Sequence, residues 1–192
     1  MDRSRPTLAR RRKVAGPGEP EVYAADEQSI AIDPMRWVQL ARAVLLDEGI
    51  RGLAELNILF VDEPSIAELN ESFLGKAGAT DVLAFPIDGE TEGQLGNVPT
   101  GPGRAAPDVD DLPLLLGDIV ICPAVAAAQA ADHAGTFDDE LALLCVHGVL
   151  HVLGYDHEVD EDGERMRQRE VDLLVAHHWC GPVPEAFRRN GP

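Results

Sequence analysis

Apolar residues recur along the chain at two kinds of spacing, which predict a mixture of helices and strands. Apolar positions three and four residues apart predict helices over residues 34–48, 65–74, 123–132, 137–153 and 161–178. Short apolar, β-prone runs predict strands over residues 21–23, 29–32, 56–61, 80–85 and 114–121. The helix over 137–153 is apolar on almost every side from Leu141 onward, so we expect it to run through the core.

Three stretches interrupt this pattern and bound the folded part. Residues 1–20 join a basic cluster to several Gly and Pro residues, which predicts a disordered tail. Residues 88–112 are rich in Gly, Pro and Asp and predict a long surface loop. Residues 181–192 are expected to form a C-terminal tail, which leaves a single domain over residues 21–180 of the 192-residue chain.

The composition excludes several classes of protein. A hydrophobic fraction of 45% and a charged fraction of 26% exclude a wholly disordered or fibrous chain. No apolar run is long enough to span a membrane, and no apolar segment of a secretory signal follows the basic start. The three cysteines are widely spaced, unlike a disulfide framework or a paired zinc motif. We therefore expect a soluble, cytoplasmic protein that does not bind membranes.

Charge is distributed unevenly along the chain. The formal net charge is −18, yet six of the 16 basic residues lie between Arg3 and Lys13, opposed there only by Asp2 at the chain start. The rest of the chain is therefore more acidic than the total and should repel nucleic acid. Two roles for the basic tail remain open: it binds a nucleic acid or another partner, or it only aids solubility.

Three of the six histidines form a cluster that suits a metal ion. His147 and His151 lie four residues apart on the predicted core helix, so their imidazoles share one face. Gly154 ends that helix and lets the chain turn, so that His157 can reach the same point. Three histidines can hold a tetrahedral Zn²⁺ and leave its fourth position to water. The alternative is a set of core histidines bonded to backbone carbonyls, which would be costly to bury, or a set of surface histidines with no common purpose.

The residue after His147 bears on which reaction a metal at this site could catalyse. Zinc peptidases with this histidine spacing carry a glutamate general base directly after the first histidine. Gly148 occupies that position here, which disfavours a peptidase. A metal at this site can still activate water or polarise a phosphoryl oxygen.

The segment His147–His157, HGVLHVLGYDH, resembles the signature of the YbeY family of zinc-dependent endoribonucleases. Two further blocks agree with that family in the same order. They are Leu69–Asn70 with Thr80–Pro86, and Leu116–Ile119. Together the three blocks extend the resemblance over roughly residues 22–178.

The resemblance implies an α+β fold in which helices pack a small mixed β-sheet, with a zincin-like metal site at the end of the buried helix. It implies a single-strand-specific endoribonuclease that matures the 3′ end of small-subunit rRNA and serves ribosome biogenesis and quality control. One Zn²⁺ per chain would be held by His147, His151 and His157. The implied partners are single-stranded RNA, the small-subunit rRNA precursor, and ribosomal proteins or the small subunit.

Three further residues are candidates for a catalytic role. Asp81 and Asp118 occupy family positions and either act on the substrate or only fix the cleft wall by hydrogen bonds. Family members often carry an arginine in the segment where this chain has Leu74, and the nearby Lys76 is a candidate phosphate contact in its place. Two other functions stay open: a metallopeptidase-like hydrolase, and a non-catalytic ribosome-assembly factor in which zinc is structural.

Overall fold

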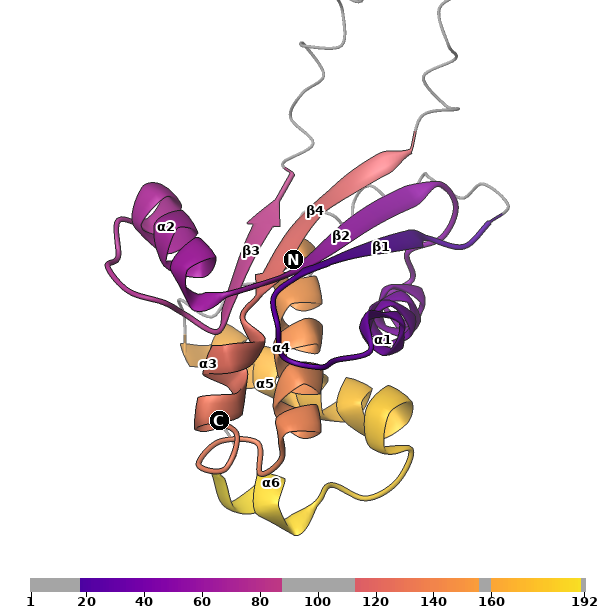
Figure 1. The fold of residues 1–192 in the computed structure, drawn as a ribbon. Coiled ribbons are helices and arrows are strands. Elements are labelled where there is room, and N and C mark those ends of the chain that lie inside the picture. The colour runs from indigo at the N-terminus through magenta and orange to yellow at the C-terminus, as the bar shows by residue number, and fades with distance from the viewer. Residues whose placement is uncertain (1–17, 88–112, 156–159, 191–192) are drawn as a thin grey trace, which may run out of the picture.

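The computed structural model describes residues 18–87, 113–155 and 160–190, in which helices pack a mixed sheet (Figure 1). The strands are β1 (Glu21–Glu27), β2 (Ala54–Val61), β3 (Val82–Pro86) and β4 (Leu114–Ile121), in the spatial order β1-β2-β4-β3. β2 pairs parallel with both β1 and β4, and β3 pairs antiparallel with β4. This arrangement confirms the α+β class with a small mixed sheet.

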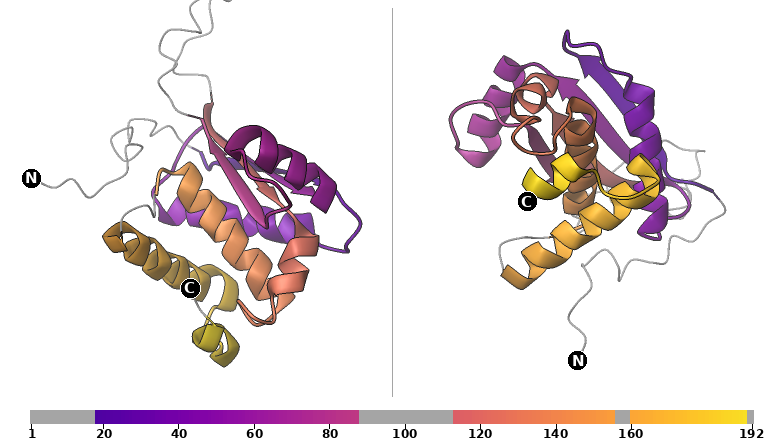
Figure 2. Two further views of the ribbon diagram at one scale, coloured as in Figure 1. Left: turned by 90° about the vertical axis from the view of Figure 1, so that its left-hand side faces the viewer. Right: turned by 90° about the horizontal axis from the view of Figure 1, so that it is seen from below.

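Helices cover both faces of the sheet (Figure 1, Figure 2). Strand alternation separates the two faces: Ile58 and Phe60 of β2 join the main core with α1 and α4, whereas Val61 joins a smaller cluster with Ile66 of α2. The helical segments are α1 (Pro34–Asp47), α2 (Glu63–Leu74), α3 (Pro123–Gln129), α4 (Phe137–Val152), α5 (Asp160–Leu174), the π-helical turn η4 (Val175–Trp179) and α6 (Glu185–Asn190).

α4 runs through the core, as its apolar sequence predicts. Every residue from Asp139 to Val152 is buried except His147 and His151, which are partly exposed. Gly148 lets the helix approach the sheet closely, because a Cβ atom at this position would lie 2.6 Å from Cγ2 of Ile119 in β4. This close approach sets the position of the histidine-bearing face of α4 relative to the sheet.

Asp139 ties the C-terminal segment to the first turn of α4. Its carboxylate accepts hydrogen bonds from Trp179 Nε1 at 2.6 Å and Thr136 Oγ1 at 2.7 Å, and His178 Nε2 lies 2.9 Å away. Burial raises the pKa of Asp139, but these hydrogen bonds outweigh burial and hold the pKa below its usual value. An ionised carboxylate therefore holds this segment against the core.

The first strand differs from its prediction. β1 is a single strand, Glu21–Glu27, and the prediction of a strand over residues 29–32 is wrong. The side chain of Gln28 explains the difference, because it accepts a hydrogen bond from the Ile30 N–H at 2.6 Å and donates one to the Ile30 carbonyl at 2.8 Å. These side-chain bonds take the place of strand pairing and form a turn.

The C-terminal stretch also differs from its prediction. The last long helix ends at Leu174 and continues as the π-helical turn η4. The expected tail over residues 181–192 contains α6, whose Phe187 is only 3% exposed and packs edge-on against Trp179, with ring centroids 4.8 Å apart. Residues 1–17 and 88–112, which hold most of the predicted tail and the whole predicted loop, lie outside the described residues. Among the helices that are described, none is long and apolar enough to cross a membrane.

Candidate metal centre

Two of the three predicted metal ligands lie together on α4. The imidazole rings of His147 and His151 stand one turn apart, with their centroids 4.4 Å apart and their planes at 77°. Gly154, with a φ of 86°, then ends the helix and turns the chain back at the end that carries His151. His157 lies outside the described residues, and within those residues no group of three metal-ligating side chains occurs.

Both rings are held through the same nitrogen. His147 Nδ1 lies 2.7 Å from Glu170 Oε1, and His151 Nδ1 lies 3.0 Å from the Tyr155 carbonyl oxygen. A carbonyl oxygen only accepts, so the proton of His151 sits on Nδ1, and the carboxylate oxygen of Glu170 can accept from Nδ1 of His147 in the same way. A neutral imidazole of this tautomer has its lone pair on Nε2. Metal-binding histidines have this arrangement, so the pair fits a metal.

The helix that supplies Glu170 is fastened to α1. Glu170 is 3% exposed on α5, and the neighbouring Arg169 forms ion pairs of 2.6 Å with both Asp47 and Glu48. Glu48 also accepts a hydrogen bond of 2.8 Å from the hydroxyl of Tyr155. Burial, together with this bond, raises the pKa of Tyr155 to about 12, so the hydroxyl stays protonated. The same ion-pair network therefore steadies the supports of both histidines.

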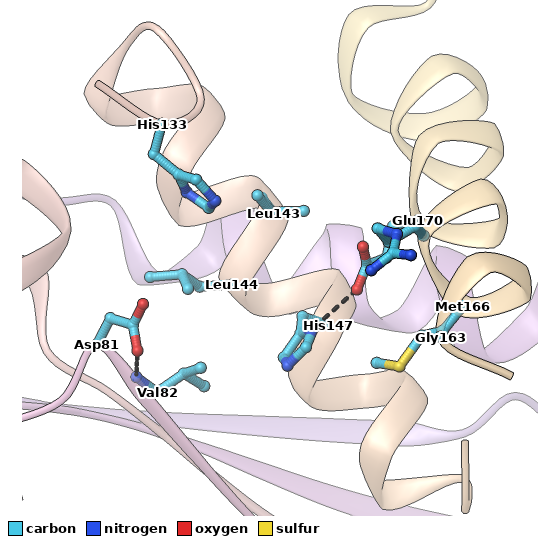
Figure 3. Close-up of a pocket in the computed structure, with 10 residues that line it drawn as sticks. Asp81, Val82, His133, Leu143, Leu144, His147, Gly163, Met166 and Glu170 are labelled. Carbon is cyan, nitrogen blue, oxygen red and sulfur yellow. Dashed lines mark hydrogen bonds and ion pairs between the residues drawn. The ribbon is translucent and has the colours of Figure 1, made fainter. Parts of the chain in front are cut away.

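A pocket of about 260 Å³ opens beside His147. Its lining comes from the start of β3, the segment between α3 and α4, the middle of α4 and one face of α5. In Figure 3 the side chains of Leu143 and Leu144 lie between the rings of His133 and His147, and Met166 and Glu170 of α5 lie beyond His147. A substrate that enters this pocket would thus lie next to His147, one of the predicted metal ligands.

Asp81 is the predicted catalytic candidate that the structure brings to this pocket. Its carboxylate accepts hydrogen bonds from the Val82 N–H at 2.8 Å and from Gln129 Nε2 at 2.7 Å, and its carbonyl accepts one from the Cys122 N–H at 2.8 Å. These bonds join β3, α3 and the end of β4. Asp81 therefore holds the pocket wall and also faces the space where a substrate would lie.

His133 pairs with Glu140, a contact that was not predicted from the sequence. Glu140 is fully buried, and its two carboxylate oxygens lie 2.9 Å from His133 Nδ1. Gln129 Nε2 donates to the same carboxylate at 2.8 Å and the Ala134 N–H donates at 3.1 Å. One signal was available: Glu140 precedes His147 by seven residues, or two helical turns, so both lie on the same face of α4.

Asp118 and Lys76 lie away from the pocket. Asp118 is partly exposed on β4 and accepts a hydrogen bond of 2.8 Å from Asn57 of β2. Lys76 is exposed in the loop after α2. Neither side chain lines the pocket beside His147, so their catalytic and phosphate-binding roles stay predictions.

A family model and similar proteins of known sequence point to the same family. The chain matches the family described as "Endoribonuclease YbeY" over residues 23–178. A protein named endoribonuclease YbeY from Acidothermus cellulolyticus is 45% identical over 156 residues, which cover 81% of this chain and 90% of that protein. One from Thermobifida fusca is 40% identical over 167 residues, which cover 87% of this chain and 99% of that protein.

A solved structure also matches. The solution structure of TM1509 from Thermotoga maritima is 24% identical, with a TM-score of 0.47 over 82% of this chain and 90% of that one.

The family match spans more than two thirds of the chain, and the two curated relatives reach the same extent at 40% and 45% identity. On this ground, the chain belongs to the YbeY endoribonuclease family.

Proposed function

We propose that this chain is a zinc-dependent endoribonuclease that cuts single-stranded RNA during maturation of the 3′ end of small-subunit rRNA, in the cytoplasm. The observation that carries the proposal is the pair of adjacent imidazoles on α4, each held through Nδ1 by an acceptor. Relatives in the same family are named endoribonucleases, which supports RNA cleavage as the reaction. The family match favours neither the peptidase nor the non-catalytic assembly factor.

The proposed zinc ligands are His147, His151 and His157, with one ion per chain. When bound, zinc would stabilise the negative charge that develops on the phosphodiester and lower the pKa of a water molecule. The chain itself orients the rings: Glu170 holds His147, and the Tyr155 carbonyl holds His151. Such outer contacts fix the tautomer and the direction of each ligand.

Gly148 argues against a peptidase for a second reason. A Cβ atom at this position would lie 2.6 Å from Cγ2 of Ile119 in β4. A side chain at this position would therefore point toward the sheet, where there is no room for a glutamate. A general base at this position, as zinc peptidases use it, is therefore sterically excluded. Phosphodiester cleavage depends more on stabilising charge than on such a base.

The remaining candidates take supporting roles in this proposal. Asp81, at the pocket wall, would position the substrate or its attacking water. Asp118 and Lys76 would contact parts of the RNA that extend beyond the pocket. The basic tail from Arg3 to Lys13 would hold RNA or a ribosomal partner, offsetting the net charge of −18.

The decisive experiment measures cleavage of a single-stranded RNA that spans the small-subunit 3′ end. Zinc-loaded wild type is compared with His151→Ala, and with His177→Ala as a matched control whose histidine lies 2.9 Å from Asp47, outside the pocket. We expect wild type and the control to cut, and His151→Ala to lose both bound zinc and cleavage. If all three proteins cut equally, or none cuts, the nuclease proposal fails and the assembly-factor function gains support.

The role of the tail has a separate test. RNA affinity is measured against salt concentration for the full chain and for a variant that lacks residues 1–13. If the tail holds phosphates, its loss makes the slope of log affinity against log salt shallower by about 0.7 for each contact. An unchanged slope would leave the tail with a role in solubility only.

A further inference from the structure

α5 presents a single face to the pocket beside His147. Gly163, Met166, Arg167 and Glu170 line this pocket, and their spacings of three, four and seven residues place them on one side of the helix. Glu170 fixes the orientation of this face, because its carboxylate lies 2.7 Å from His147 Nδ1. The helix therefore brings the Arg167 guanidinium to the same pocket as the predicted metal ligand.

Arg167 differs from the other ionisable groups that line the pocket. Asp81, His133 and Glu170 each have a hydrogen-bonding or ionic partner within the protein. Arg167 makes no hydrogen bond or ion pair with any residue that the structure describes, and its side chain is exposed. By contrast, Arg169 on the same helix is bound by Asp47 and Glu48. The Arg167 guanidinium thus has its charge and its donors available for a ligand.

We propose that Arg167 binds a phosphate of the RNA that occupies this pocket. The planar guanidinium fork matches two phosphate oxygens, which a lysine ammonium cannot do. Lys76, the candidate from the sequence, does not line the pocket, so Arg167 on α5 supplies the phosphate contact inside the pocket and Lys76 acts only on RNA outside it. This inference rests on the proposed endoribonuclease function, because it names the group that holds the substrate of that site.

The test uses three variants of the full, zinc-loaded chain: Arg167→Ala, Arg167→Lys and the control Arg165→Ala. Arg165 lies on the same helix and does not line the pocket, so its replacement removes the same charge from nearly the same place. Binding is measured by fluorescence anisotropy with a labelled single-stranded DNA of the rRNA 3′-end sequence, over a range of salt concentrations. Cleavage of the matching RNA supplies kcat and KM.

Arg167→Ala should weaken binding about tenfold, as expected for a charged hydrogen-bonded contact. It should also make the salt slope shallower by about 0.7. Arg167→Lys should keep the salt slope and recover only part of the affinity, and Arg165→Ala should resemble wild type. For cleavage, Arg167→Ala should raise KM more than it lowers kcat. Equal behaviour of the two alanine variants, or no binding by wild type, would overturn the inference.

The two proposals can fail separately. If wild type does not cut RNA and DNA binding still depends on Arg167, the endoribonuclease proposal fails and the phosphate contact stands. If wild type cuts RNA and Arg167→Ala matches Arg165→Ala in KM and in DNA affinity, the phosphate contact fails alone.

Discussion

Replacing Gly148 with alanine tests whether the contact between α4 and the sheet sets the metal centre. The added Cβ atom would lie 2.6 Å from Cγ2 of Ile119, 3.2 Å from Cδ1 and 3.3 Å from Cγ1. Cγ2 is bonded to the branched Cβ of a fully buried side chain, which has little freedom at χ1. Either the helix or the strand must therefore move to admit the methyl group.

Two opposing terms set the size of the effect. Overpacking of a close-packed core costs about 1–3 kcal/mol, whereas alanine in place of glycine in a helix interior gains about 1 kcal/mol. We expect Gly148→Ala to lower the free energy of unfolding by roughly 1 kcal/mol, measured by urea unfolding of the zinc-free protein. Zinc affinity should fall as well, because His147 is the adjacent residue.

The Ile119→Ala background provides the sharper test. It removes all three atoms that the new methyl group would meet, at a cost of its own of about 2–5 kcal/mol. In that background Gly148→Ala should stabilise the protein by about 1 kcal/mol, since only the helix-propensity gain remains. The sign of the effect therefore reverses between the two backgrounds. A stabilising effect of Gly148→Ala in both backgrounds, with unchanged zinc affinity, would refute this account.

Three further changes probe the surroundings of the site. Glu170→Gln should lower zinc affinity about 10–100-fold in competition with a chelator, and an effect no larger than that of exposed Glu164→Gln would exclude an orienting role. Glu140→Ala should cost about 3 kcal/mol in urea unfolding, because it leaves His133 and two other donors without their acceptor. The pKa of Asp139 is lower in the folded protein than in the unfolded chain. The ionised carboxylate therefore stabilises the fold at pH values above the unfolded-state pKa, and this stability is lost as the pH falls through the folded-state pKa. Asp139→Asn should therefore flatten the loss of stability below about pH 4, and an unchanged pH profile would contradict the assignment.

The sequence predicted those parts of the site that depend on neighbours along one helix. His147 and His151 share a face because they lie four residues apart, and the apolar run around them places the rest of the helix in the core. Glu170 could not be found in this way, because it reaches His147 across 23 residues of sequence and through the packing of α5 on α4. The spacing of apolar residues shows that Met166, Leu173 and Leu174 of α5 turn inward, but it does not show which residue of another helix the neighbouring Glu170 meets.

Specific side-chain contacts explain the errors in the fold prediction. Residues 29–32 alternate like a strand, but the Gln28 side chain bonds the Ile30 backbone and forms a turn. The expected tail after residue 180 contains α6, because Phe187 packs against Trp179 and Trp179 is in turn held by Asp139. The bond between Trp179 and Asp139 joins residues 40 positions apart, a range at which periodicity carries no signal.

A net charge of −18 need not prevent binding of an anionic substrate at this site. The pocket carboxylates Asp81 and Glu170 each face a donor within the protein, whereas Arg167 has no described partner. At physiological salt, exposed charges act over about 8 Å, so distant surface carboxylates affect a bound phosphate less than this guanidinium does. Salt then has two effects, since it screens both the repulsion by the acidic body and the attraction by Arg167. RNA affinity should therefore depend on salt less steeply in this protein than in a basic nuclease with the same number of phosphate contacts.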